Sequence, residues 1–166
     1  MSLSALVLAG SRPGRPDPVA LAEGVSHKAL AEVGGQPMLA RVIAALHDAG
    51  IDRVAVAAND PQVVLLATRL GAEVLPPQAG PSASVAAAFA RMGAPMVVTT
   101  SDHGLLQGHW VRDFLTDVPD AADVALLLAR REVVEAAQPD ARRTWLRFAD
   151  GQWSGCNLFL LATPAA

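Results

Sequence analysis

The sequence has little of several residue types, and each scarcity narrows the class of protein. Its 166 residues contain one cysteine, Cys156, so no internal disulfide can form, and we expect a protein of the reducing cytoplasm. Aromatic residues make up only 4% of the chain, whereas 52% is hydrophobic and mostly Ala, Val and Leu. This mixture is typical of close-packed helices and parallel strands.

Further absences exclude whole kinds of partner. No apolar run approaches the roughly 20 residues that a membrane span needs, and the first residues lack the charged and apolar segments of a secretory signal. The net charge is −3, and no basic stripe is present that would favour nucleic acid. We therefore expect one cytoplasmic domain with no membrane and no nucleic-acid partner.

Lysine is nearly absent as well. Of the 13 residues that are Lys or Arg, only Lys28 is a lysine. An ammonium is a compact point charge, whereas a guanidinium is a planar fork, so the two are not interchangeable at a binding site. We expect Lys28 to lie where a point charge is needed.

A glycine turn follows the first apolar run. Residues 5–9 are continuously apolar, which predicts a parallel strand covered on both faces. Gly10 and Gly14 allow backbone N–H groups to approach a ligand, and Arg12 and Arg15 add positive charge beside them. The stretch therefore predicts a site for a small anion.

The rest of the chain alternates between strand and helix patterns, which predicts stacked βα units around a mostly parallel sheet. We expect strands at 53–58, 73–75, 96–100 and 124–128, and helices at 38–50, 61–70, 110–115 and 131–137. A further helix should end at Met92 and be capped by Ser82 or Ser84. Residues 144–148 and 153–161 should form a hairpin. Thr163 and Pro164 then have the pattern of a helix start. We expect residues 1–166 to form a single domain that lacks a C-terminal helical part.

Polar residues follow two of the predicted strands. Asp102 comes directly after the strand at 96–100, and Gly10 directly after the first strand. Ligands of open parallel sheets bind at the carboxyl ends of the strands, so these two residues should share one edge. The N-terminus of the helix that ends at Met92 offers a second place for an anion.

Several familiar motifs are missing. The turn at Gly10 lacks the Gly-x-Gly-x-x-Gly spacing of dinucleotide folds, no Gly-Lys-Ser/Thr follows as in a P-loop, and there is no Gly-x-Ser-x-Gly elbow of a hydrolase. The four histidines, at 27, 47, 103 and 109, do not have zinc-ligand spacing.

The opening motif resembles that of the MobA-like nucleotidyltransferases, the molybdenum-cofactor guanylyltransferase type within the wider sugar-phosphate nucleotidyltransferases. The matching residues are Leu8, Ala9, Gly10, Ser11, Gly14, Arg15 and Lys28. The resemblance implies that these residues and Arg12 bind a nucleotide, and that Lys28 and Arg15 are the catalytic residues that hold its triphosphate. Ser11 stands where the family usually has a second glycine, and it still supplies a backbone N–H. His27 replaces the usual proline, and the longer segment between Arg15 and Lys28 could be a lid.

Later segments extend the resemblance over nearly the whole chain. The segment ending at Asp102 resembles the family's strand-end metal aspartate, and the segment ending at Asn157 resembles its later Gly-x-Asn segment. The resemblance thus implies Mg²⁺ held by Asp102 and Asn157, both oxygen donors of the kind that Mg²⁺ prefers. Gly80, Ser82 and Ser84 resemble the turn that touches the base or ribose.

The family implies a three-layer α-β-α sandwich of the nucleotidyltransferase/GT-A-like Rossmann type. It also implies transfer of a nucleoside monophosphate from a nucleoside triphosphate to a phosphorylated small-molecule acceptor, with release of pyrophosphate. Two alternatives stay open. A nucleotide-sugar glycosyltransferase would release a nucleoside diphosphate and commonly carries an Asp-x-Asp pair, which is absent around Asp102; the other alternative is a catalytically silent nucleotide-binding module.

Overall fold

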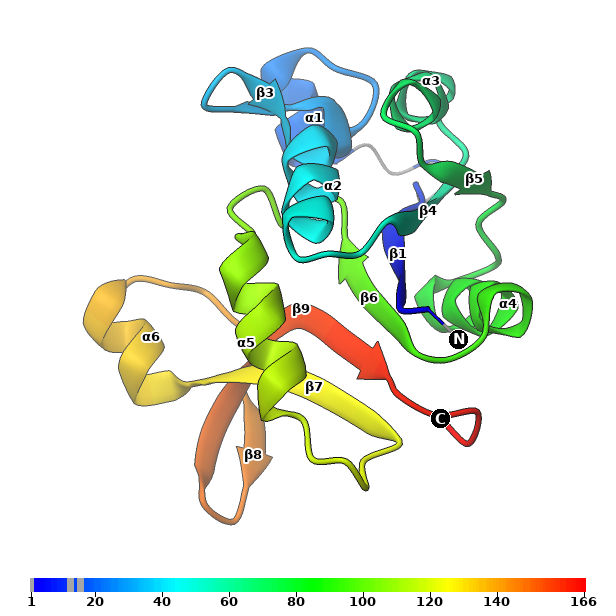
Figure 1. Ribbon diagram of the computed structural model, residues 1–166. Coiled ribbons are helices and arrows are strands. Elements are labelled where there is room, and N and C mark those ends of the chain that lie inside the picture. The colour runs from blue at the N-terminus through cyan, green and yellow to red at the C-terminus, as the bar shows by residue number, and fades with distance from the viewer. Residues whose placement is uncertain (1, 12–13, 15–16) are drawn as a thin grey trace.

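The structure is a computed structural model that describes residues 2–11, 14 and 17–166. A central sheet lies between two layers of helices (Figure 1). Its strand order is β5 (Glu73–Leu75), β4 (Arg53–Ala58), β1 (Ser4–Ala9), β6 (Met96–Thr100), β9 (Gly151–Leu161) and β7 (Val124–Arg130), with β8 (Leu146–Phe148) paired to β9. β5, β4, β1 and β6 are parallel, whereas β9 pairs antiparallel with β6, β7 and β8. The predicted three-layer α/β architecture is confirmed.

Helices cover both faces of the sheet. The larger cluster of buried side chains lies under α2 (Met38–Asp48), α3 (Pro61–Arg69) and α5 (Gly108–Asp117), and a second cluster lies under α4 (Pro81–Met92). β1 is buried between the two clusters, because Leu6 faces one and Val7 faces the other. This explains why its sequence is a continuous apolar run.

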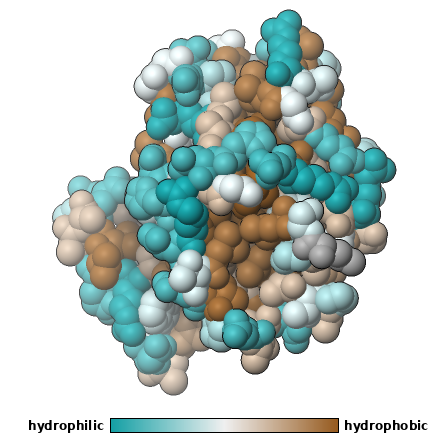
Figure 2. All heavy atoms as spheres, viewed as in Figure 1, coloured by the Kyte–Doolittle hydropathy of each residue, from teal (hydrophilic) through white to brown (hydrophobic). Residues whose placement is uncertain are grey.

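The face covered by α4 becomes more exposed toward the β7 edge. Val98 of β6 pairs with Phe159 of β9, which pairs in turn with Leu126 of β7, so the three side chains share one face. Val98 is 3% exposed, Phe159 is half-buried and Leu126 is 53% exposed. Figure 2, which has the same viewpoint as Figure 1, shows hydrophobic residues gathered in the middle of the molecule, between the positions of α4 and α5.

Local signals placed most of these elements correctly. Asp60 caps α3 by accepting hydrogen bonds from the N–H groups of Gln62 and Val63, and Pro61 is the first helical residue. The predicted strands at 53–58, 73–75 and 96–100, α6 (Arg131–Ala137) and the hairpin of β8 with β9 are also present. Among the described residues, no helix combines the length and the hydrophobicity that a membrane crossing requires.

One capping prediction was wrong. Neither Ser82 nor Ser84 caps α4, because the helix starts earlier, at Pro81, with Gly80 as its N-cap residue and no side-chain cap. Proline is favoured at the first helical position, since its missing N–H would have no helical partner there. Ser84 lies inside the first turn, and its hydroxyl donates to the carbonyl of Gly80.

Four small elements before α2 were not predicted: α1 (Pro18–Glu23), the 3-10 turn η1 (Lys28–Leu30), and a hairpin of β2 (Glu32–Val33) with β3 (Gln36–Pro37). The segment that the sequence suggested as a lid thus contains a helix. Asp17 caps α1, Pro18 opens it and Gly24 ends it with a φ of 66°. This is the same chemistry that identified α3 from the sequence.

Candidate functional site

A pocket of about 1330 Å³ opens at the carboxyl ends of the parallel strands. Of the residues expected to bind a nucleotide or metal, those that line it are Leu8, Ala9, Gly10, Ser11, Gly14, Lys28, Gly80, Ser84, Asp102 and Asn157. Ser82 is exposed and is not among the described lining residues. Arg12 and Arg15 lie outside the described residues, so their predicted roles stay predictions.

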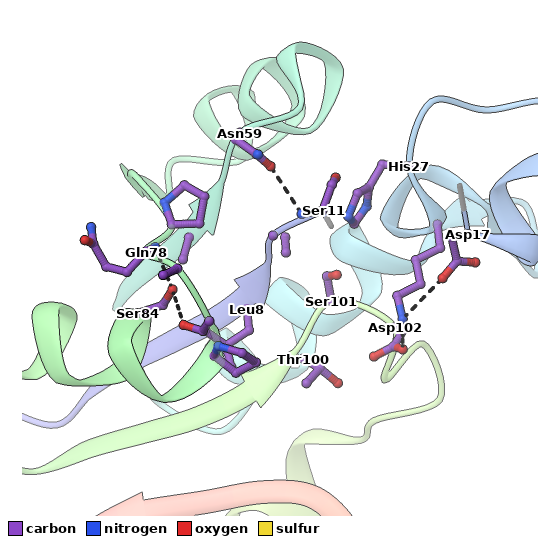
Figure 3. Close-up of a pocket in the computed structure, with 18 of the residues that line it drawn as sticks. Leu8, Ser11, Asp17, His27, Asn59, Gln78, Ser84, Thr100, Ser101 and Asp102 are labelled. Carbon is purple, nitrogen blue, oxygen red and sulfur yellow. Dashed lines mark hydrogen bonds and ion pairs between the residues drawn. The ribbon is translucent and has the colours of Figure 1, made fainter. Parts of the chain in front are cut away.

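Two groups of side chains face each other across this pocket (Figure 3). Asp17, His27 and Asp102 lie on one side, and Gln78 and Ser84 lie on the other. The first group comes from the chain around η1 and from the end of β6, and the second from the β5–α4 loop and α4. The pocket therefore spans the parallel half of the sheet, from β6 to β5.

Lys28 and Asp102 form a hydrogen-bonded ion pair on the first of these sides. The Lys28 Nζ donates to the Asp102 Oδ2 at 2.6 Å, and it also lies 3.6 Å from the Asp17 Oδ2. Each of the three side chains is about one-third exposed, at 33%, 32% and 34% respectively. The single lysine thus lies between two carboxylates, with access to the pocket.

The two partners alter each other's pKa. Burial by itself would raise the pKa of Asp102, but the hydrogen bond from Lys28, together with Thr100, the positive charge of Lys28 and the backbone of Asp102, outweighs it and lowers this pKa from its usual 3.8. Burial would likewise lower the pKa of Lys28, but the hydrogen bond and charge of Asp102, together with Asp17, raise it above 10.5. Both groups are therefore charged at neutral pH.

His27 has a structural position next to Lys28. It is 6% exposed, and its Nδ1 accepts a hydrogen bond from the N–H of Ala29 at 3.0 Å, which caps η1. Burial lowers the pKa of His27 from 6.5, and this effect outweighs the opposite influence of Asp60. The ring is neutral at pH 7 with its proton on Nε2.

The glycine turn after β1 is attached to the end of β4. The backbone N–H of Ser11 donates to the Asn59 Oδ1 at 3.2 Å. A Cβ added to Gly10 would lie 3.4 Å from the Cβ of Pro77, which is ordinary van der Waals contact. The protein itself therefore leaves room for a larger residue at Gly10, while an incoming phosphate would compete with Asn59 for the Ser11 N–H.

Ser84 shapes the opposite side of the pocket. Its hydroxyl accepts from the N–H of Gln78 at 2.9 Å and donates to the carbonyl of Gly80 at 3.0 Å. It is 6% exposed. Ser84 thus holds the β5–α4 loop in place, a role that its position in the sequence did not indicate.

Asn157 enters the pocket through an irregularity in β9. Its φ is 52°, and the partners of β9 along β7 shift between Leu126 and Leu128. Bulges of this kind redirect side chains and are common near functional sites. The Asn157 carbonyl accepts from the Thr99 hydroxyl at 2.8 Å, which fixes the turned backbone against β6.

The oxygen donors present suit Mg²⁺ that arrives with a ligand. Asp102 supplies one carboxylate and Asn157 an amide at the same pocket, and no group of three or more His, Cys, Asp or Glu side chains forms a metal site within the described chain. Mg²⁺ is usually held by one or two carboxylates together with substrate phosphates and water, rather than by a complete protein cage. Asp102 and Asn157 fit that pattern.

Sequence reasoning missed several residues of the site. Asp17, Asn59, Gln78 and Ser101 all line the pocket. Ser101 and Asn59 follow β6 and β4, so the position of each at a strand end was a usable signal. No sequence pattern marks Asp17 as a partner of Lys28, because that pairing depends on how α1 packs.

The fold and the position of this pocket define an α/β domain with the architecture of the nucleotidyltransferases. The chain matches the MobA-like NTP transferase domain over residues 5–152 and belongs to that family. No curated protein matches the sequence.

Solved structures agree with this assignment. A hypothetical transferase from Thermus thermophilus is 31% identical, with a TM-score of 0.77. The match covers 98% of this chain and 66% of the Thermus thermophilus chain. A CMP:2-keto-3-deoxy-manno-octonic acid synthetase complexed with CTP is 19% identical, with a TM-score of 0.70 over 98% of this chain and 74% of that one. A nucleotidyl transferase from Methanothermobacter thermautotrophicus is 21% identical, with a TM-score of 0.68 over 95% of this chain and 70% of that one. The last two establish the fold alone.

Proposed function

We propose that the domain binds a nucleoside triphosphate with Mg²⁺ and transfers its nucleotidyl group to a phosphorylated small-molecule acceptor, releasing pyrophosphate. One observation carries this proposal: the only lysine meets Asp102 at 2.6 Å in a pocket that also includes the glycine turn at Gly10. The pocket volume of about 1330 Å³ exceeds the roughly 300–1,000 Å³ typical of small-molecule sites, so a nucleotide has room.

The charges suit a triphosphate. Attack on the α-phosphorus spreads negative charge over the phosphate oxygens, so catalysis depends on in-line positioning and on cations, and no protein nucleophile is required. The Lys28 ammonium would bind phosphate oxygens and offset the charge of the leaving pyrophosphate. Asp17 and Asp102 would orient this ammonium, because both carboxylates lie within 4 Å of it.

Asp102 and Asn157 would hold Mg²⁺ together with the phosphates. When bound, Mg²⁺ would neutralise part of the negative charge of the phosphates. A cation there would also compete with Lys28 for Asp102, leaving the ammonium available to the phosphates. The turn held by Ser84 would lie against the base or ribose, across the pocket from Asp102, the hydrogen-bond partner of Lys28 (Figure 3). Arg15 is proposed as a second phosphate-binding cation.

Thermal-shift titration tests binding, and pyrophosphate release tests transfer. The protein is titrated with ATP, GTP, CTP and UTP, with and without Mg²⁺, and pyrophosphate is then measured with a panel of sugar phosphates and other phosphorylated acceptors. We expect one nucleotide to raise the melting temperature, with a further increase in Mg²⁺, and at least one acceptor to release pyrophosphate. No stabilisation by any of the four nucleotides would overturn the proposal.

The same assays separate the alternatives. A nucleotide-sugar glycosyltransferase would be stabilised by nucleoside diphosphate sugars and would release a nucleoside diphosphate. A silent module would bind nucleotide and leave it intact with every acceptor.

A further inference from the structure

The N-cap of α3 makes a contact outside its own helix. Asp60 Oδ1 accepts from the N–H groups of Gln62 and Val63 at 2.9 and 3.0 Å, as an N-cap does. The same oxygen accepts from the Ser26 hydroxyl at 3.1 Å. The cap of one helix is therefore hydrogen-bonded to a residue 34 positions earlier in the chain.

Ser26 lies two residues before Lys28. Between them, the His27 ring caps η1 through the N–H of Ala29, and the carbonyl of Lys28 accepts from the N–H of Ala31 at 3.0 Å. These hydrogen bonds join His27 and η1 into a short unit that carries the Lys28 side chain. The Ser26 hydroxyl joins the start of this unit to α3.

We propose that Asp60 and Ser26 form a clamp that positions Lys28 in the pocket. Both are positioning residues, since they hydrogen-bond to each other and to the start of α3 and neither supplies the phosphate-binding charge, although Ser26 also lines the pocket. The clamp itself follows from the hydrogen bonds, whereas its effect on nucleotide binding rests on the proposed function. Placement matters because the proposed chemistry depends on geometry, and a misplacement of about 1 Å can cost roughly 100-fold in rate.

The single lysine permits a direct test without any ligand. Protein labelled with ¹⁵N-lysine gives one backbone amide signal, that of Lys28. Its heteronuclear NOE and its chemical shift are compared in wild type, Ser26→Ala, Ser26→Thr and Asp60→Asn. Ser26→Thr keeps the hydroxyl, and asparagine keeps an oxygen that can both cap α3 and accept from Ser26.

We expect Ser26→Ala to lower the heteronuclear NOE of the Lys28 amide and to shift its signal, because the segment that carries Lys28 loses its hydrogen bond to α3. Ser26→Thr and Asp60→Asn should stay close to wild type. Thr116→Ala is the matched control, because the Thr116 hydroxyl bonds to the Arg112 carbonyl on α5. An unchanged NOE and chemical shift of the Lys28 amide in Ser26→Ala would overturn the clamp, whether or not any nucleotide binds.

A second measurement links the clamp to the site. ATP, GTP, CTP and UTP are titrated with Mg²⁺ into the same variants, and we expect Ser26→Ala to weaken binding about 3- to 10-fold while its melting temperature without nucleotide stays near that of wild type. Equal affinity for wild type and Ser26→Ala would contradict a positioning role at the nucleotide site. Absence of binding in wild type would instead contradict the proposed function, and the NMR comparison would still decide the clamp.

Discussion

Lys28 and Asp102 are 74 positions apart in the sequence, yet the lysine Nζ donates a 2.6 Å hydrogen bond to the aspartate Oδ2. The contact joins the turn that follows α1 to the end of β6. Because both side chains are about one-third exposed, the pair contributes little to folding compared with a buried pair. Its position in the pocket is the basis of the role in nucleotide binding that we propose.

Replacing Lys28 with alanine should weaken nucleotide binding. A charge-assisted hydrogen bond contributes about 1.5–3 kcal/mol, so we expect a loss of roughly 10- to 100-fold in affinity. Arg91→Ala is the control, because Arg91 is an exposed cation near the end of α4 that pairs with Glu73. Calorimetric titration measures both variants, and equal losses in the two would show a general effect of charge.

Alanine at Gly10 separates a folding role from a ligand role. The added Cβ would meet Pro77 at 3.4 Å, and Gly10 is not among the glycines with a left-handed φ, so we expect the melting temperature to change little. If phosphate approaches the backbone here, the same methyl group should reduce nucleotide binding at least tenfold. Gly155→Ala is the control, because Gly155 also has open space around its Cβ and is not among the residues described as lining the pocket. If the Gly10→Ala variant unfolds more readily but binds nucleotide normally when folded, Gly10 is needed for folding and not for binding.

Asp102→Asn tests the predicted metal ligand. Asparagine retains an oxygen but loses the charge that attracts Mg²⁺, so the stabilisation by nucleotide alone should persist while the additional increment from Mg²⁺ disappears. Thermal-shift titrations with and without Mg²⁺ give the two quantities. An undiminished Mg²⁺ increment would remove Asp102 from the metal site.

The pH dependence of stability should reveal the two histidines with lowered pKa values. Burial lowers the pKa of His27 and His103 from 6.5, so the unfolded chain binds their protons more tightly than the folded chain does. Their contribution is therefore complete above pH 6.5 and is lost as the pH falls from there through the folded pKa values. Protonation of His27 Nδ1 would also break its bond to the Ala29 N–H.

An asparagine side chain can supply the same cap without a titrating ring, so His27→Asn should flatten this slope below pH 6.5. Urea unfolding at a series of pH values measures the slope. His27→Asn with the slope of wild type would assign the pH dependence to other groups.

Much of the fold was predictable because local chemistry defines it. Buried apolar runs marked β1, β4 and β6, and an Asp-Pro start with a glycine end marked α3. The same pattern from Asp17 to Gly24 marks α1, and it was overlooked. The rule that ligands bind at the carboxyl ends of parallel strands correctly placed Gly10 and Asp102 in one pocket.

The remaining contacts depend on tertiary packing. No sequence pattern pairs Lys28 with Asp17, or Ser11 with Asn59, because residues of different elements meet only once the sheet has assembled. Ser84 was expected to cap α4, but the helix begins at Pro81 and the serine hydroxyl holds the β5–α4 loop instead, while its contact with a nucleotide stays a prediction. The left-handed backbone of Asn157 likewise depends on the irregular pairing of β9 with β7.

The most direct measurement is calorimetric titration of wild type and Lys28→Ala with ATP, GTP, CTP and UTP in the presence of Mg²⁺. We predict that one of these nucleotides binds wild type at a single site and that the alanine variant binds it at least tenfold more weakly. Without ligand, the two proteins should have the same melting temperature. Equal affinity in the two proteins, or no binding to wild type, would contradict a triphosphate site built around Lys28.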